Sequence, residues 1–119
     1  MKKILSGNLD RLIEETPQTR GWFLGKFMQD NPDYLSQKIE IKWVNEKRGH
    51  VKPGLSSSKN LKTYAILVSG KMKVCFNNTQ EEVLLEKQGD YVYFDTSYSD
   101  HTSYVLEDCT LLAIRWEEE

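Results

Sequence analysis

Two histidines carry the clearest chemical potential of this 119-residue chain. His101 follows a turn-rich segment, whereas His50 lies in a polar stretch with Glu46 four residues before it. Imidazole nitrogens combined with a carboxylate suit Fe(II), Mn(II), Ni(II) or Zn(II) and leave positions open for a substrate. One hypothesis is therefore a single divalent transition metal held by His101, His50 and Glu46, which requires an ordered polar stretch. The alternative, favoured by the Gly and Ser content of that stretch, is that His101 makes hydrogen bonds inside a pocket without a metal.

A second group of residues is typical of a small-molecule pocket. Side chains alternate between the two faces of a strand, so Ser103 shares a face with His101. If Thr63, Ala65 and Leu67 also face inward, the pocket is mostly apolar with a few hydroxyl and imidazole groups, the usual composition of a small-molecule site. Aromatic residues are frequent in this part of the chain, and we expect some to line the mouth of the pocket. The predicted ligand pocket comprises Thr63, Ala65, Leu67, Tyr91, Tyr93, His101 and Ser103.

The first half of the chain predicts a helix followed by strands. Apolar residues at helical spacing, stopped by a proline, predict a short helix over residues 6–15. An aromatic run over residues 21–28 predicts the first strand. Residues 38–43 alternate between charged and apolar, the pattern of a strand with one solvated and one buried face. The polar residues 45–60 predict a mobile loop.

The second half of the chain predicts a β-meander. Short strands alternate with turn signals, at about 8–12 residue intervals, which favours an all-β sandwich or a jelly-roll barrel of about eight strands. We expect residues 1–20 to form the helix and a lead-in, residues 21–116 the barrel, and residues 117–119 an acidic tail. The predicted strands of this half are residues 63–68 and 71–76, joined as a hairpin, and residues 82–86, 91–94, 101–106 and 111–116.

Composition limits the class of protein. A chain of 119 residues fits one domain with a sufficient core. The formal net charge of −2 offers no argument for a nucleic-acid partner. Apolar runs are far shorter than the roughly 20 residues of a membrane span. Cys75 and Cys109 lack the spacing of a redox or metal motif, and polar residues interrupt the apolar start of the chain, so we expect a cytoplasmic protein.

Two motifs resemble those of the cupin superfamily, the small RmlC-like jelly-roll barrels. In the first cupin motif, an H-x-H pair and a glutamate precede a strand that ends at a glycine. Residues 63–70 match this strand, but Thr63 stands in place of the glutamate and the H-x-H pair is missing. In the second motif, Gly-Asp opens a strand that leads through a turn to a histidine. Gly89, Asp90 and His101 match, whereas the proline and glycine of the turn do not.

The resemblance extends from about Trp22 to Trp116, with a W-F-x-G-x-F segment and a C-terminal R-W that are similar to those of short bacterial cupins. It implies a single-domain cupin jelly-roll barrel with a short N-terminal helix and a site in the barrel mouth. It also implies a homodimer. The aromatic strand of residues 22–28 is the expected interface, because an exposed apolar edge favours pairing.

Three functions are compatible with these residues. The first is a barrel that binds a small molecule without catalysis, which the missing H-x-H pair and Thr63 support. The second is a metal-dependent enzyme of the oxygenase, isomerase or lyase type, acting on a small metabolite through His101, His50 and Glu46. The third is a metal-free acid–base enzyme with His101 as the base and a tyrosine as the acid. We favour the first, with a small-molecule ligand and neither a nucleic-acid nor a membrane partner.

Overall fold

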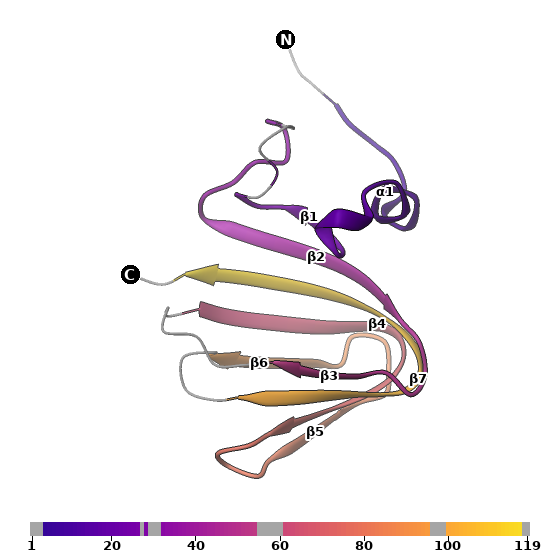
Figure 1. Ribbon diagram of the computed structural model, residues 1–119, viewed down its shortest axis with the longest axis vertical. Helices are drawn as coiled ribbons and strands as arrows, with labels where there is room; N and C mark the ends of the chain where they lie inside the picture. The colour runs from indigo at the N-terminus through magenta and orange to yellow at the C-terminus, as the bar shows by residue number, and fades with distance from the viewer. Residues whose placement is uncertain (1–3, 27, 29–31, 55–60, 96–99, 118–119) are drawn as a thin grey trace.

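The computed structural model describes residues 4–26, 28, 32–54, 61–95 and 100–117. In these residues a short α-helix and a 3-10 turn precede seven strands (Figure 1). The order of the elements is α1 (Leu9–Glu15), η1 (Pro17–Thr19), β1 (Trp22–Leu24), β2 (Ile39–Glu46), β3 (Val51–Gly54), β4 (Leu61–Phe76), β5 (Glu82–Leu85), β6 (Tyr91–Asp95) and β7 (His101–Glu117).

The long strands β4 and β7 form the antiparallel spine of the barrel. β2 pairs with the C-terminal half of β7, and β6 pairs with the N-terminal half of β4, which makes one sheet with β1 at its edge. β3 pairs with the N-terminal half of β7, and β5 pairs with the C-terminal half of β4, which makes the opposite sheet. The two sheets share β4 and β7 and close into an all-β jelly-roll barrel with a short N-terminal helix (Figure 1).

The predicted hairpin at residues 69–70 is wrong, because residues 61–76 form one bent strand. Gly70 has a φ of 93°, and a Cβ there would overlap the backbone of Asp108 and Cys109. The register against β7 shifts three times between Leu67 and Met72, so the chain bends there without reversing. β7 likewise runs continuously through the segment predicted as a turn. The described residues therefore hold seven strands where the sequence predicted about eight.

The predicted loop over residues 45–60 is also partly wrong. β2 continues to Glu46, and β3 pairs with β7 from Val51 opposite Tyr104 to Gly54 opposite His101. β3 contains Pro53, which an edge strand tolerates because its N–H side needs no partner strand. Residues 55–60 of this predicted loop, and residues 27 and 29–31 near the predicted first strand, lie outside the described part of the chain.

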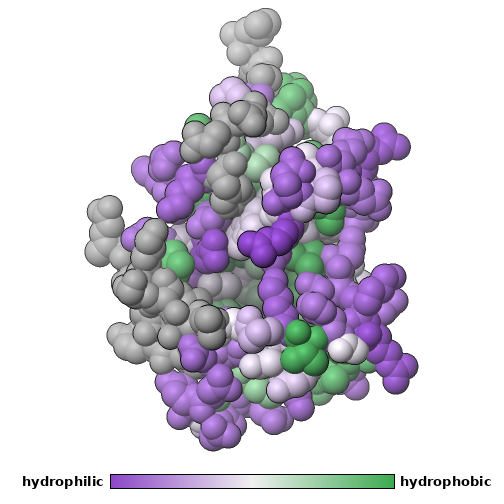
Figure 2. Space-filling view, viewed as in Figure 1, coloured by the Kyte–Doolittle hydropathy of each residue, from purple (hydrophilic) through white to green (hydrophobic). Residues whose placement is uncertain are grey.

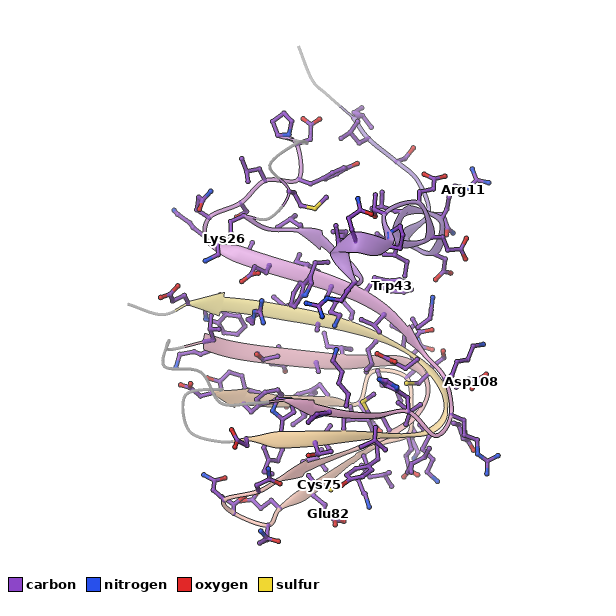
Figure 3. The ribbon with its side chains drawn as sticks, in the orientation of Figure 1. Arg11, Lys26, Trp43, Cys75, Glu82 and Asp108 are labelled. Carbon is purple, nitrogen blue, oxygen red and sulfur yellow. The ribbon has the colours of Figure 1, made fainter. Side chains whose placement is uncertain are left out.

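The hydrophobic core lies between the two sheets. Its most buried side chains are Leu67 and Leu85, each 1% exposed, and its other buried members are Met72, Val74, Val92, Val105, Cys109 and Leu111. α1 packs on the outside of the barrel, where Asp10 Oδ1 accepts hydrogen bonds from Trp43 Nε1 at 2.9 Å and Asn45 Nδ2 at 2.6 Å. Figure 3 shows Trp43 and Arg11 at this contact, with Cys75 and Glu82 together at the β4–β5 hairpin. No helix among the described residues is long and apolar enough to cross a membrane.

Candidate functional site in the barrel mouth

The register of the strands identifies which side chains face the barrel interior. Directly paired residues on neighbouring strands share a face. Leu67 and Leu111 are paired and buried in the core, so the side chains two and four residues along each strand also face inward. On β4 these are Ala65 and Thr63. On β7 they are Ala113 and Arg115, and the buried Val105 places Ser103 and His101 on the inner face of the other sheet.

Five of the predicted pocket residues therefore share the interior. They are Thr63, Ala65, Leu67, His101 and Ser103. Leu67 lies deepest, within the hydrophobic core. Thr63 and His101 lie at the opposite end of the barrel, where the bent strands β4 and β7 both begin and end (Figure 1). We call this end the mouth of the barrel and the end beyond Leu67 its base.

Tyr91 and Tyr93 do not belong to this interior, which corrects the prediction that they line the pocket. Val92 and Phe94 are the inward residues of β6, so the tyrosines on either side face outward. They are 56% and 46% exposed, and the Tyr91 ring stacks on Tyr64 with 4.8 Å between centroids. Their aromatic character therefore serves packing on the outer face of the sheet.

His101 is held in an aromatic corner of the mouth. Its ring centroid lies 4.6 Å from that of Phe94 and 6.1 Å from that of Phe76. Gly54 lies directly opposite, where any Cβ would overlap the imidazole ring. Nδ1 of His101 is buried and has no hydrogen-bond partner among the described residues. Burial lowers the pKa of His101 below 6.5, and the charge of Lys52 lowers it further while Asp100 opposes the shift. The ring is therefore neutral near pH 7.

The predicted metal trio does not come together. Glu46 and His50 are close, with 3.7 Å between Oε2 and Nε2, but His50 is half exposed. His50 exchanges backbone hydrogen bonds near Val105, whereas His101 lies opposite Gly54 at the far end of β3. Four residues of strand separate the two histidines by roughly 13 Å. The described residues contain no group of three or more His, Cys, Asp or Glu side chains that could hold a metal ion.

Sequence reasoning missed a group of charged residues on the inner face. Glu40 pairs with Arg115, Lys42 with Ala113 and Lys52 with Ser103. Because each partner faces inward, these charged side chains do as well. The alternation of residues 38–43 was therefore correct, but its charged face is directed into the barrel. The apolar face that carries Trp43 is on the outside, partly covered by α1.

Trp22 connects two of these cations. The guanidinium carbon of Arg115 lies 4.4 Å from the Trp22 ring centroid, and Nζ of Lys42 lies 5.5 Å from it. Such cation–π contacts are strongest where water is partly excluded. Arg115 also forms an ion pair with Glu40, with 3.0 Å between Nη2 and Oε2. Within the described part of the chain, its buried Nε atom has no hydrogen-bond partner. The edge strand β1 thus contributes to the interior through Trp22.

Lys42 has the most unusual titration in the mouth. Burial, a hydrogen bond with Lys52 and the charge of Lys52 together lower the pKa of Lys42 from 10.5 to about 7. Arg20 adds to this effect, whereas the negative charge of Glu46 opposes it. Near neutral pH this amine is therefore protonated in only about half of the molecules.

Comparison with known proteins identifies the fold. No protein-family model matches the chain, and no curated protein matches it significantly. Among solved structures, an RmlC-like cupin protein from Desulfovibrio desulfuricans superposes with a TM-score of 0.59 at 15% identity, over 68% of this chain and 74% of that one. KdgF from Halomonas sp. gives 0.58 at 19% identity, over 71% and 73% of the two chains. A Streptococcus pyogenes protein of unknown function gives 0.58 at 16% identity, over 71% and 68%.

The chain has the fold of an RmlC-like cupin. Within this cupin barrel the interior divides into two layers. The base layer is apolar, whereas the mouth layer holds histidine, lysine, arginine, glutamate and hydroxyl groups around aromatic rings. In the view of Figure 2, hydrophilic side chains surround a hollow near the centre of the face. The mouth residues are Trp22, Glu40, Lys42, Lys52, Thr63, Ala65, Phe94, His101, Ser103, Ala113 and Arg115.

Proposed function

We propose that this protein binds a small organic molecule in the mouth of its barrel through side chains alone, without a metal shell. The observation that carries this proposal is the pair of buried nitrogens that have no hydrogen-bond partner among the described residues, Nδ1 of His101 and Nε of Arg115. A buried polar atom without a partner costs about 1–3 kcal/mol. A ligand that hydrogen-bonds to both nitrogens removes this cost. Phe94 connects the two sites, because it contacts His101 and pairs with Thr63, which pairs in turn with Arg115.

The surroundings of the two nitrogens fit a small organic ligand. Phe94, Phe76 and Trp22 supply aromatic surface, and the hydroxyls of Thr63 and Ser103 supply a few polar contacts. Small-molecule sites are usually built in this way, with mostly apolar walls and a small number of polar groups that fix the orientation of the ligand.

Thermal-shift measurements against a collection of small metabolites test this function. We expect a stabilising compound whose effect is lost in His101→Gln and kept in Tyr93→Phe, a matched change on the outer face of the barrel. A compound that stabilises His101→Gln as strongly as the unaltered protein would place its binding elsewhere and contradict the proposal.

Metal analysis of protein purified without an affinity tag is the companion measurement. We expect binding of the small molecule to survive treatment with a chelator. Stoichiometric Fe, Mn, Ni or Zn that disappears in His101→Ala, together with loss of ligand binding, would instead favour metal-dependent chemistry at this histidine.

We also propose that the protein is a cytoplasmic homodimer. The support for pairing is that β1 is the edge strand of its sheet and carries the aromatic residues Trp22 and Phe23. A monomeric mass by light scattering at micromolar concentration would contradict it. The support for a reducing compartment is the pair of free cysteines, Cys75 and Cys109. Burial, followed by the charges of Glu46 and Asp108, raises the pKa of Cys109 to about 11, so this thiol is unreactive.

A further inference from the structure

Two lysines on the inner faces of opposite sheets, the partly buried Lys42 and the exposed Lys52, approach each other at the barrel mouth. Lys42 belongs to β2 and Lys52 to β3, and both strands direct these side chains to the interior. The two amines are close enough for a hydrogen bond and for electrostatic repulsion to affect the titration of Lys42. Like charges at such separations cost free energy, and the cost is greater where burial excludes water. Without a negative group between them, this arrangement is unfavourable.

The other charges in the mouth do not compensate both lysines. Arg115 and Glu40 neutralise each other in their own ion pair. Glu46 is the remaining inward carboxylate near Lys42, and its Oε2 also lies 3.7 Å from Nε2 of His50. Arg20 adds a further positive charge on the η1 side. Among the described residues, the charges of two lysines against the one carboxylate of Glu46 leave a modest excess of positive charge around the two amines.

The residues beside the lysines are small or polar. Ala113 pairs with Lys42 and also with the inward Ala65, so neither strand places a bulky side chain next to this amine. Ser103 pairs with Lys52 and contributes a hydroxyl. The ring of Trp22 borders Lys42 on the side of β1. Apart from Trp22, the described neighbours that pair with these two lysines or border them are therefore small.

We propose that the ligand of the barrel mouth is a small carboxylate whose anionic group lies between Lys42 and Lys52. This inference rests on the proposed function and specifies its ligand class. Each ammonium donates to a carboxylate oxygen, and the single negative charge relieves their repulsion. A monoanion matches the modest positive excess better than a phosphate dianion does. The buried nitrogens of His101 and Arg115 then bind the uncharged part of the ligand.

Proton uptake gives this proposal a specific signature. A carboxylate binds the protonated form of Lys42, and about half of the molecules lack that proton near pH 7. Binding at pH 8 should therefore take up close to one proton per site. The charges of Lys52, Glu46 and Arg20 act on Lys42, the Trp22 ring lies against its amine, and Glu40 and Arg115 lie two residues along the paired strands. Of these, only Glu46 favours the protonated amine in the free protein.

Calorimetry with defined probes tests the carboxylate. The probes are lactate, pyruvate and benzoate, with lactamide and benzamide as neutral counterparts and inorganic phosphate as a second anion. Titrations at pH 8 in two buffers of different ionisation enthalpy measure the proton uptake. We expect at least one carboxylate to bind at least tenfold more tightly than its amide or phosphate. Lys42→Met and Lys52→Met should each weaken that binding at least tenfold, and Lys42→Met should abolish the proton uptake.

Lys73→Met is the matched control, because this substitution removes the same charge from the outer face, where Lys73 lies over the Tyr104 ring. It should bind the carboxylate as the unaltered protein does. Equal binding of acid and amide, a preference for phosphate, unchanged binding in Lys42→Met, or no binding by any carboxylate overturns the proposal. The proposed function is judged separately. A neutral ligand that requires His101 would support a small-molecule site while excluding the carboxylate.

Discussion

The base and the mouth of the barrel are built from the same strands but have opposite compositions. At the base, Leu67, Leu85, Met72 and Val105 are at most 5% exposed and belong to one cluster of buried apolar side chains. A few residues along β4 and β7, the mouth contains charges and two buried nitrogens that no described residue hydrogen-bonds. The base therefore provides folding stability, whereas the mouth retains unfavourable interactions. Such local costs are typical of functional sites, where a ligand relieves them.

The largest expected effect is a loss of stability when a buried side chain at the base is truncated. Leu67→Ala removes a side chain that is 1% exposed and leaves a cavity between the sheets. We expect the free energy of unfolding to fall by about 3 kcal/mol, as measured by urea denaturation. Leu84→Ala is the control, because Leu84 is 45% exposed on the neighbouring β5. Equal losses in the two variants would show that the interior of the base does not dominate stability.

The next expected effect is a gain in stability and concerns the mouth. Lys42→Met replaces a partly buried amine with an apolar side chain of similar length. Because the folded state lowers the pKa of Lys42 to about 7, the unfolded chain binds its proton more tightly between pH 7 and 10.5. We expect the variant to be more stable than the unliganded protein by on the order of 2 kcal/mol at pH 7, after allowance for solvent screening.

The pH dependence of that difference is equally specific. The contribution of Lys42 makes the unaltered protein more stable as pH rises from 7 to 10.5, and this contribution should be absent from Lys42→Met. Urea denaturation at pH 7, 8.5 and 10 measures it. If Lys42→Met is the less stable protein at every pH, the mouth is a stabilising charge network and the contrast with the base fails.

A smaller effect concerns His101 at low pH. Burial lowers its pKa, so the unfolded state takes up a proton first as the pH falls through 6.5. The unaltered protein should lose stability below that pH, and His101→Gln should lose less. His50→Gln should behave as the unaltered protein, because His101 is still present. Identical stability profiles from pH 7 to 5 for all three proteins would exclude a buried, neutral His101.

The smallest expected effect concerns an exposed ion pair that belongs to neither the base nor the mouth. Lys47 and Asp108 form an ion pair at 3.7 Å with side chains that are 87% and 66% exposed. Exposed pairs of this kind contribute little, so Lys47→Ala should change stability by less than about 0.5 kcal/mol. A chemical denaturation curve that differs clearly from that of the unaltered protein would show that the bend of β7 is more sensitive than its exposure indicates.

The sequence predicted most of the helices and strands but not how consecutive strands are connected. The helix, the strands near residues 39–46, 82–85 and 91–95 and the cupin jelly roll agree with the structure. The hairpin at residues 69–70 was wrong because a glycine with positive φ serves a tight turn or a strand bend equally well. Only the contact between Gly70 and the backbone of Asp108 and Cys109 distinguishes the two.

The candidate site shows what the sequence by itself determined and what only the tertiary structure decided. Alternation along each strand established that Thr63, Ala65 and Leu67 share one face, that His101 and Ser103 share another, and that Lys42 lies opposite its apolar neighbours. It left open which face of each strand points inward. The packing of the two sheets decided that, placing Tyr91 and Tyr93 on the outer face and Lys42 and Lys52 on the inner faces of their strands. The physical reason is that periodicity is a local property, whereas the inside of a barrel exists only once distant strands have paired.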